Sequence, residues 1–378
     1  MRTQIVNSAD TNAYMSACDA IVGALREGAL VVFPTETVYG VAANAANLEA
    51  VRRLRELKGG TDQRPFTVHL ARRSDARRYV RSPSPLLRRL ARKGWPGPLT
   101  LVAQEPEPEQ TEVAHICPPA QWHEIFHDGT VGLRCPDHPV AQRLLSEVAV
   151  PIVATSANRS GRPAPCDLAA ALQDLDGKVE YALDAGRTRF SSASTIVAVR
   201  GNGWEMRRAG AVDERTIRRW ARSEILFVCT GNSCRSPMAA YMFRQQFAAH
   251  LGGAVEDLAA AGYGMSSAGT GAVPDGEASA GTLEELARRG IDAHDHRSQP
   301  LTVELIQRAE RIYVMSPEHR SIVLDLVPGA AAPELLDPEG PIADPIGGGP
   351  EAYEQCAARV ERCVQARVRE FVDEDLHW

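Results

Sequence analysis

The chain has 378 residues and a formal net charge of −6, with 44% hydrophobic and 24% charged residues. This balance is typical of a globular protein, and the length favours two domains over one. No apolar run approaches the ~20 residues that cross a bilayer, and the N-terminus lacks the basic and apolar regions of a secretion signal. We therefore expect a soluble, cytoplasmic protein without a membrane partner.

Charge is distributed unevenly along the chain. Residues 1–210 carry 26 Lys and Arg against 22 Asp and Glu, a net charge of +4, whereas residues 211–378 carry 16 against 26, a net charge of −10. Within the first part, residues 52–93 hold 14 basic and 3 acidic side chains. Such a cluster could meet a nucleotide or an RNA backbone, but the simpler interpretation is a solvated, Arg-rich helical face.

Helical and strand patterns alternate in the first part of the chain. Apolar residues at helical spacing predict helices over residues 11–27 and 48–57. Apolar or β-branched runs between Pro and Gly residues predict strands over residues 29–33, 66–70, 99–103, 131–134, 152–154 and 194–199. We expect an α/β or α+β domain with a mixed sheet.

The pattern then restarts. Residues 211–224 are charged with a helical period, which predicts a connecting helix. Next come a strand (225–228), a Gly-containing loop, helices (236–250 and 280–289), a strand (311–315) and a last helix (350–372). This order predicts a small, doubly wound parallel sheet. We assign residues 1–210 and 224–378 to two domains and residues 211–223 to a linker helix.

The sharpest chemical signal lies between the strand at 225–228 and the helix at 236–250. The run there reads Cys229, Thr230, Gly231, Asn232, Ser233, Cys234, Arg235, Ser236 and Pro237. Backbone N–H groups of such a loop, at a helix N-terminus, form a nest for an anion. The same positive field should lower the pKa of Cys229 and give a thiolate nucleophile, while Arg235 grips two phosphate oxygens.

These residues resemble the loop of the low-molecular-weight protein phosphatases, Cys-x-Gly-Asn-x-Cys-Arg-Ser-Pro, and the resemblance extends over about residues 224–372. It implies that Cys229 and Arg235 are catalytic and that an Asp-Pro pair supplies the general acid. Asp344-Pro345, followed by a Gly-rich run and Tyr353, fits that place better than Asp337-Pro338. The resemblance also implies a protective disulfide between Cys229 and Cys234 under oxidation.

The resemblance leaves the phosphorylated protein substrate open. Ser233 stands where tyrosine-directed members have a bulky aliphatic residue and the protein-arginine phosphatases a small hydroxyl residue. Ile346 stands where many members have an aromatic residue, which weakens one wall of a phosphotyrosine slot. We therefore favour phosphoarginine slightly over phosphotyrosine. An arsenate reductase is an alternative, although no third redox cysteine stands out in the right region.

The first domain offers cations, hydroxyls and glycines on loops, which suit phosphate and carboxylate binding. Its motifs are residues 34–40, Lys58, Arg64-Pro65, His69, residues 95–100, 134–136, 155–161, Ser194-Thr195 and residues 208–210. Together they resemble the YrdC-like threonylcarbamoyl-adenylate synthase family across about residues 8–211. That family condenses threonine, bicarbonate and ATP into threonylcarbamoyl-AMP, which supplies a tRNA modification.

The resemblance implies a role for individual residues. Threonine and its carbamoyl group would be held by Thr37, His69, Arg134, Ala154 and Ser194. The ATP site would be lined by Lys58, Gly60, Arg64, Thr130, Ser156, Ala164 and Arg208. A Mg²⁺ ion would be bound through the phosphates, and tRNA or tRNA-modifying proteins are possible partners.

One position departs from the family pattern. The family reads Lys-x-Arg where this chain reads Lys58-Gly59-Gly60. Loss of an arginine beside the triphosphate removes about 2–4 kcal/mol of transition-state stabilisation unless another group, such as Arg64, replaces it. The alternative interpretation is a nucleotide- or RNA-binding module without synthase activity.

Residues 123–127 spell the His-Glu-x-x-His motif of zinc hydrolases. That site needs both histidines on one helical face. Pro118-Pro119 and Gly129 leave room for barely two helical turns, so we interpret the motif as a chance match and expect no metal site built from side chains.

Overall fold

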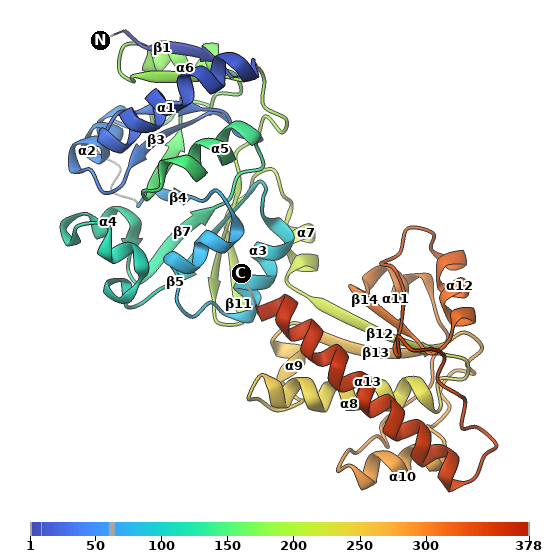
Figure 1. The fold of residues 1–378 in the computed structure, drawn as a ribbon. Coiled ribbons are helices and arrows are strands. Elements are labelled where there is room, and N and C mark those ends of the chain that lie inside the picture. Colours follow the sequence, from blue (N-terminus) through green and yellow to red (C-terminus); the bar gives the residue numbers. More distant parts are fainter. Residues whose placement is uncertain (1, 9, 60–64, 377–378) are drawn as a thin grey trace. The chain divides into compact units, whose positions relative to one another are not determined.

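The computed structural model of the chain describes residues 2–8, 10–59 and 65–376 (Figure 1). The chain divides into two compact units, with the division between Ala221 and Arg222. Within the described residues, no helix is both long and apolar enough to span a membrane.

The first unit is built on one mixed sheet with the strand order β1-β9-β2-β3-β8-β4-β7-β5-β10-β11, and β6 lies beside β7. Four pairs are parallel, namely β1–β9, β2–β9, β4–β7 and β5–β10. The strands are β1 (Gln4–Asn7), β2 (Val31–Phe33), β3 (Gly40–Asn44), β4 (Thr67–His69), β5 (Leu99–Gln104), β6 (Phe126–His127), β7 (Thr130–Arg134), β8 (Ile152–Ser156), β9 (Tyr181–Asp184), β10 (Thr195–Arg200) and β11 (Gly203–Arg208). The predicted mixed sheet is thus confirmed.

Helices cover both faces of this sheet. Val32 belongs to one hydrophobic core and its neighbours Val31 and Phe33 to the other, because successive side chains of a strand point to opposite faces. The helices are α1 (Thr11–Glu27), α2 (Leu48–Leu57), α3 (Pro85–Gly94), α4 (Trp122–Ile125), α5 (Pro139–Val148), α6 (Leu168–Leu175) and α7 (Glu214–Trp220), with short 3₁₀ turns at Arg73–Arg78, Pro108–Gln110, Glu112–His115 and Pro119–Gln121. Helices α1 and α5 pack on one face, and α2, α3, α6 and α7 contribute to the other core.

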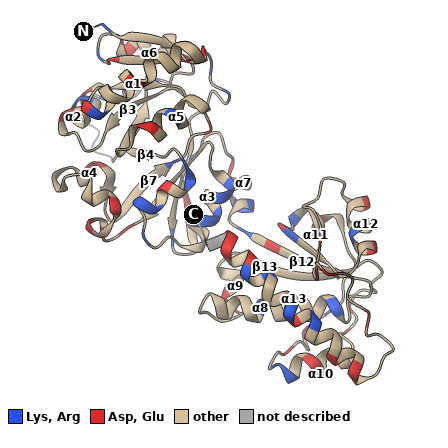
Figure 2. Cartoon of the chain, viewed as in Figure 1, with Lys and Arg blue, Asp and Glu red and all other residues tan. Residues whose placement is uncertain are grey.

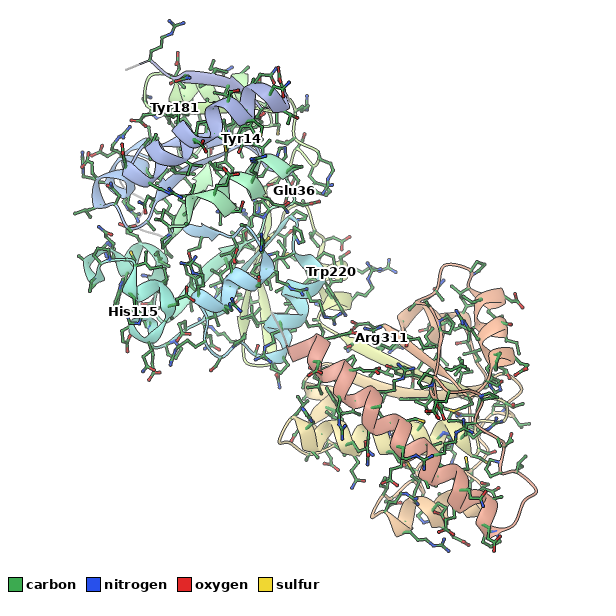
Figure 3. All side chains as sticks on the ribbon, viewed as in Figure 1. Tyr14, Glu36, His115, Tyr181, Trp220 and Arg311 are labelled. Carbon is green, nitrogen blue, oxygen red and sulfur yellow. The ribbon has the colours of Figure 1, made fainter. Side chains whose placement is uncertain are left out.

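Helix α7 occupies the place of the expected linker. Its Ile217 is fully buried in the core of the first unit, and Trp220, labelled in Figure 3, packs against the same core. The carbonyl oxygen of Ala221, directly after the helix, accepts a hydrogen bond of 2.6 Å from the buried Arg89. The helix is therefore part of the first unit and does not bridge two bodies as a free linker.

The second unit has four parallel strands in the order β13-β12-β14-β15. The strands are β12 (Ser223–Cys229), β13 (Tyr263–Gly269), β14 (Arg311–Val314) and β15 (Glu334–Leu335). The helices are α8 (Arg235–His250), α9 (Asp257–Ala260), α10 (Ala280–Arg288), α11 (Val303–Arg308), α12 (Pro317–Leu326) and α13 (Pro350–Leu376). Residues of α8, α10 and α13 build one core and residues of α11 and α12 the other, so the predicted doubly wound sheet is confirmed (Figure 1).

Among the described residues, five of the 14 basic side chains of residues 52–93 form ion pairs. Figure 2 marks the basic positions of the first unit in blue and the acidic ones in red along the ribbon. Pairs join Arg52 to Glu49 and Glu56, Arg53 to Glu180, Arg55 to Glu124, Arg78 to Glu112, and Arg81 to Glu105 and Glu107. The cluster therefore agrees with the simpler interpretation of a solvated Arg-rich surface better than with an open patch for RNA.

Candidate functional sites

The first candidate site is a cavity of about 270 Å³ in the first unit. Strands β3, β4, β5, β7, β8, β10 and β11 all contribute to its lining. It brings together eight of the residues that the sequence singled out, namely Lys58, His69, Arg134, Ala154, Ser156, Ala164, Ser194 and Arg208. Threonine- and ATP-assigned residues thus converge on one cavity, although they are up to 150 positions apart, from Lys58 to Arg208.

Arg134 is held at the end of β7 by a buried carboxylate. Its guanidinium donates hydrogen bonds of 2.9 Å to Glu36 and 2.6 Å to Thr37 Oγ1, and the two charged side chains are 6% and 1% exposed. Glu36, labelled in Figure 3, also accepts the backbone N–H of Asp137 at 3.0 Å. Thr37 itself is fully buried behind Arg134 and does not line the cavity. The loop after β2 therefore fixes the direction of Arg134.

His69 is a neutral imidazole in this cavity. Burial, and after it the charge of Arg134, lowers the pKa of His69 to about 3. Its Nδ1 lies 3.1 Å from the carbonyl oxygen of Thr67, which can only accept, so Nδ1 carries the proton. The remaining ring nitrogen, Nε2, is left as a hydrogen-bond acceptor for a ligand.

Cations and hydroxyls define the other walls of the cavity. Lys58 Nζ donates to the carbonyl oxygens of Ser156 at 3.2 Å and Asn158 at 2.7 Å, which ties the end of α2 to the end of β8. Arg208 donates to the carbonyl oxygen of Ser194 at 2.8 Å and to its hydroxyl at 3.0 Å. These contacts place the positive side chains of Lys58 and Arg208, which are far apart in the sequence, at one cavity.

Among the described residues, one expected ATP-site residue, Thr130, is not part of this arrangement. Gly60 and Arg64 lie outside the residues that the structure describes. Thr130 does not line the cavity, because it stands at the other end of β7 from Arg134. It lines a second cavity, of about 200 Å³, together with Val102 and Ala198.

The second candidate site is the loop between β12 and α8. The sulfur of Cys229 accepts the backbone N–H of Asn232 at 3.3 Å and lies 3.0 Å from Ser236 Oγ. Asn232 has a φ of +54°, in the left-handed region, and its side-chain amide donates to the hydroxyls of Ser236 and Ser267 at 2.9 Å. The bend around the sulfur is therefore fixed by side-chain hydrogen bonds.

The pKa of Cys229 differs from our expectation. The hydrogen bonds from Ser236 and Asn232 and the charge of Arg235 do favour the thiolate, but burial outweighs them and raises the pKa of this thiol. Cys229 is 2% exposed. Arg235 is also ion-paired with Asp344, which compensates part of the positive field that should act on the sulfur. The expected lowering of the pKa is thus wrong for this arrangement.

The two Asp-Pro pairs have different surroundings. Asp344 accepts a hydrogen bond from the buried guanidinium of Arg235, which also donates to the carbonyl oxygen of Ile342 at 3.1 Å. Asp337 is paired instead with Arg359 on α13, at 2.7 Å. Geometry therefore favours Asp344 as the carboxyl group of this site.

The residues around the mouth of the loop bear on the choice of substrate. Ser233 Oγ lies 3.6 Å from the sulfur of Cys234, which lies 3.2 Å from Ser279 Oγ, and Cys229 and Cys234 are both free thiols. Ile346 is 59% exposed beside Asp344. Tyr353 is buried against Gly281 of α10 and does not provide an open aromatic wall. The aliphatic Ile346 thus lies beside the candidate acid, Asp344, and Ser233 lies in the loop itself.

Two histidines contact the loop that contains Cys229. His296 has its Nε2 2.8 Å from the carbonyl oxygen of Asn232. His319, on α12, has its Nε2 2.9 Å from Thr230 Oγ1. Our sequence analysis missed His319 because it lies 89 residues from Thr230 and in no recognisable motif.

The His-Glu-x-x-His motif is divided between two elements. His123 lies in the four-residue helix α4, whereas His127 lies in strand β6. The two histidines therefore do not share a helical face. No group of three His, Cys, Asp or Glu side chains suited to a metal ion occurs among the described residues.

Comparison with known proteins agrees with this division into two sites. Residues 23–210 match the model of the Sua5–YciO–YrdC family, whose description reads "Telomere recombination", and residues 224–376 match the family of low molecular weight phosphotyrosine protein phosphatases. The putative threonylcarbamoyl-AMP synthase of Mycobacterium tuberculosis is 36% identical over 215 residues, which are 57% of this chain and 94% of that protein. The chain therefore belongs to the Sua5–YciO–YrdC family, and its second unit is a phosphatase-family domain.

Three further proteins show how much of the chain is similar to known proteins. The threonylcarbamoyl-AMP synthase of Bacillus subtilis is 35% identical over 195 residues, 51% of this chain and 53% of that protein. The chain spans about half the length of this relative and of the one from Pyrococcus abyssi, at 53% and 48%. A solved structure of the YwlE arginine phosphatase from Geobacillus stearothermophilus is 32% identical and covers 41% of this chain and 96% of that one, with a TM-score of 0.36.

Replacing Asp344 with asparagine should lower the pKa of Cys229. The change removes the carboxylate that compensates the charge of Arg235, so the thiolate becomes more stable. A lower pKa raises the fraction of thiolate at pH 7, which speeds alkylation by iodoacetamide. The less basic thiolate is also less nucleophilic, which offsets part of this gain, so we expect the rate to rise only about threefold to tenfold. Asp337→Asn, the matched control, should leave the rate unchanged. Equal rates for the two variants would contradict the assignment of the Arg235–Asp344 pair.

Proposed function

We propose that the chain is a bifunctional enzyme. Its first unit would condense L-threonine, bicarbonate and ATP into L-threonylcarbamoyl-AMP and pyrophosphate, and its second unit would hydrolyse phosphorylated proteins through Cys229. The cavity in which His69, Arg134 and Lys58 converge carries the first activity. The bend that places the sulfur of Cys229 at the N-terminus of α8, next to Arg235, carries the second.

The threonine end of the cavity combines one fixed cation with one acceptor. The Nε–H of Arg134 has no hydrogen-bond partner among the described residues, so it can donate to a carboxylate or carbamate oxygen. Nε2 of the neutral His69 can accept a hydrogen bond from the hydroxyl or amino group of threonine. Ser194 and Ala154 complete this part of the lining. The donors and the acceptor thus match a zwitterionic hydroxy amino acid.

The nucleotide would extend along the same face of the sheet. Thr130, Gly132 and Arg134 are every second residue of β7, so they face the same side of the sheet. The cavity at Arg134 and the second cavity at Thr130 therefore lie on the same side of β7. An elongated ligand such as a nucleoside triphosphate fits this arrangement, and the positive side chains of Lys58 and Arg208 line the first cavity. Among the described residues, the lining of the first cavity contains no carboxylate, so a Mg²⁺ ion there would be held by phosphate oxygens and water.

The proposed reaction needs no covalent bond to the protein. A carbamate oxygen of N-carboxythreonine attacks the α-phosphorus of ATP, the bond to the bridging oxygen breaks, and pyrophosphate leaves. Fixed positive groups lower the barrier by positioning the reactants and stabilising negative charge. Release of pyrophosphate by the purified full chain should therefore require both threonine and bicarbonate and should yield the adenylate. ATP turnover without these dependences would instead favour a nucleotide- or RNA-binding module.

The proposed phosphatase reaction has two steps. After the thiol of Cys229 has given its proton to water, the thiolate attacks phosphorus while the protonated carboxyl group of Asp344 gives its proton to the leaving group, and a phosphocysteine forms. Asp344 then takes a proton from water, whose oxygen attacks phosphorus and releases phosphate and the thiolate. Because Arg235 is paired with Asp344, the phosphate of the substrate has to displace this carboxylate to be gripped by the guanidinium.

We further propose phosphoarginine as the preferred substrate, and Ser233→Ile tests it. A small hydroxyl residue at the loop leaves room for a broad guanidinium, whereas an aliphatic side chain favours a flat aromatic ring. The variant should change the ratio of kcat/KM for phosphoarginine and phosphotyrosine by about tenfold in favour of phosphotyrosine. Ser321→Ile, at an exposed position of α12, serves as the control. An unchanged ratio in Ser233→Ile would refute the role of Ser233.

A further inference from the structure

A chain of hydrogen bonds in the second unit runs from α12 to Asp344. Ser316 Oγ lies 3.0 Å from His319 Nδ1, and His319 Nε2 lies 2.9 Å from Thr230 Oγ1. Arg235 donates to the same Thr230 oxygen at 3.4 Å and is paired with Asp344. His319 is 4% exposed, whereas the side chain of Thr230, the next member of the chain, lies at the surface. The chain of hydrogen bonds connects a buried imidazole to the guanidinium proposed to grip the phosphate.

The chemistry of the partners sets the direction of these hydrogen bonds. A guanidinium only donates, so Thr230 Oγ1 accepts from Arg235 and keeps its own proton to give away. His319 Nε2 is the acceptor within reach, and the imidazole proton then resides on Nδ1 and points to Ser316. In this order the hydrogen bonds run in series from Arg235 to Thr230, from Thr230 to His319 and from His319 to Ser316, and hydrogen bonds in series strengthen one another.

A neutral imidazole is required for this order. Burial is the first cause that lowers the pKa of His319, and the charge of Arg235 lowers it further, against the effect of Glu318 and Asp344. A charged imidazole would donate from both nitrogens and could not accept from Thr230. The surroundings of His319 therefore support its role as an acceptor.

We propose that His319 is a positioning residue of the phosphatase, which orients the guanidinium of Arg235 through the hydroxyl of Thr230. This role rests on the proposed phosphatase function. His319 touches neither the sulfur of Cys229 nor the carboxylate of Asp344 through any hydrogen bond found among the described residues. Its effect on the reaction therefore has to pass through Thr230.

A double-mutant cycle with p-nitrophenyl phosphate tests this dependence. His319→Leu and Thr230→Val should each lower kcat/KM about tenfold, because each leaves the guanidinium without its lateral support. The kcat/KM of the double variant should be no lower than that of Thr230→Val alone, since the effects of two residues that act through one contact are not additive. His319→Gln, whose amide oxygen can accept from Thr230, should stay within about threefold of the wild type. Losses that multiply in the double variant would overturn the proposal.

Val323→Ala provides the control for a merely structural role. Val323 is fully buried on the same helix, α12, so its truncation should lower the melting temperature while leaving kcat/KM unchanged at 25 °C. If Val323→Ala lowers kcat/KM as much as His319→Leu does, general loosening of α12 explains the effect and the positioning role fails.

A spectroscopic measurement keeps the proposal separate from the proposed function. Long-range ¹⁵N–¹H correlation spectra of the full chain should show His319 as the neutral tautomer protonated at Nδ1, with an Nε2 resonance that shifts in Thr230→Val. A tautomer protonated at Nε2 would overturn the proposal even if the wild type hydrolyses the ester. If the wild type hydrolyses p-nitrophenyl phosphate no faster than Cys229→Ser does, the phosphatase assignment fails. The spectrum alone then decides whether the hydrogen-bond chain exists.

Discussion

Cys229→Ser should abolish hydrolysis of phosphate esters by the chain, with a fall in kcat of about 10⁴-fold or more. A serine hydroxyl is far less ionised than a thiol, so the nucleophile is lost while the bend remains, because the hydroxyl can still lie beside Ser236 and accept from Asn232. The phosphate should still bind. Orthovanadate titrated into the variant in a calorimeter should therefore retain its affinity within about tenfold.

Cys363→Ser is the matched control for the loss of a thiol in the same unit. Cys363 is half-buried on α13 and packs against the core of the second unit, and its replacement should leave kcat unchanged. Residual hydrolysis above 1% of wild type in Cys229→Ser, with an intact fold, would contradict a thiol nucleophile. Reduction of arsenate by the wild type in the presence of a thiol reductant, without ester hydrolysis, would favour the reductase alternative.

The sequence predicted the phosphate loop well because all of its parts are local. Seven consecutive residues from Cys229 to Arg235, one strand and one helix start are enough to define the bend, and the structure contains each of them. The pKa of Cys229 could not be predicted in the same way. It depends first on burial, to which elements distant in sequence contribute, and this effect outweighs the hydrogen bonds from Ser236 and Asn232 and the charge of Arg235.

The first unit shows a similar limit. The residues that line its cavity could be assigned through family resemblance, but the arrangement of their partners could not. Glu36 belongs to a motif that the sequence analysis quoted without giving the carboxylate a role, and only its hydrogen bond with Arg134 in the structure shows that the loop after β2 faces the end of β7. Strand β9 was also missed, because Tyr181–Asp184 is short and lacks the alternation that marks a half-buried strand.

The prediction for Arg134 couples activity to stability. Arg134→Met should lower synthase activity about 10²-fold or more, because a fixed charged donor is removed from the site where negative charge develops. It should also destabilise the first unit by about 3–5 kcal/mol, since the carboxylate of Glu36 is left buried without its cation. The melting temperature of the first unit should then fall by about 10 °C.

The double variant Glu36→Gln/Arg134→Met separates the two effects. Replacing the carboxylate removes the buried charge while keeping an acceptor for the N–H of Asp137, so most of the stability should return. Activity should not return, because the donor for the carboxylate or carbamate of the substrate is still absent. Arg53→Met, which breaks a half-exposed pair with Glu180 outside the cavity, should change both quantities little. If Arg134→Met kept synthase activity within threefold of the wild type, Arg134 would be a structural partner of Glu36 alone. If the double variant stayed as unstable as Arg134→Met, the buried charge of Glu36 would not be the cause of the instability.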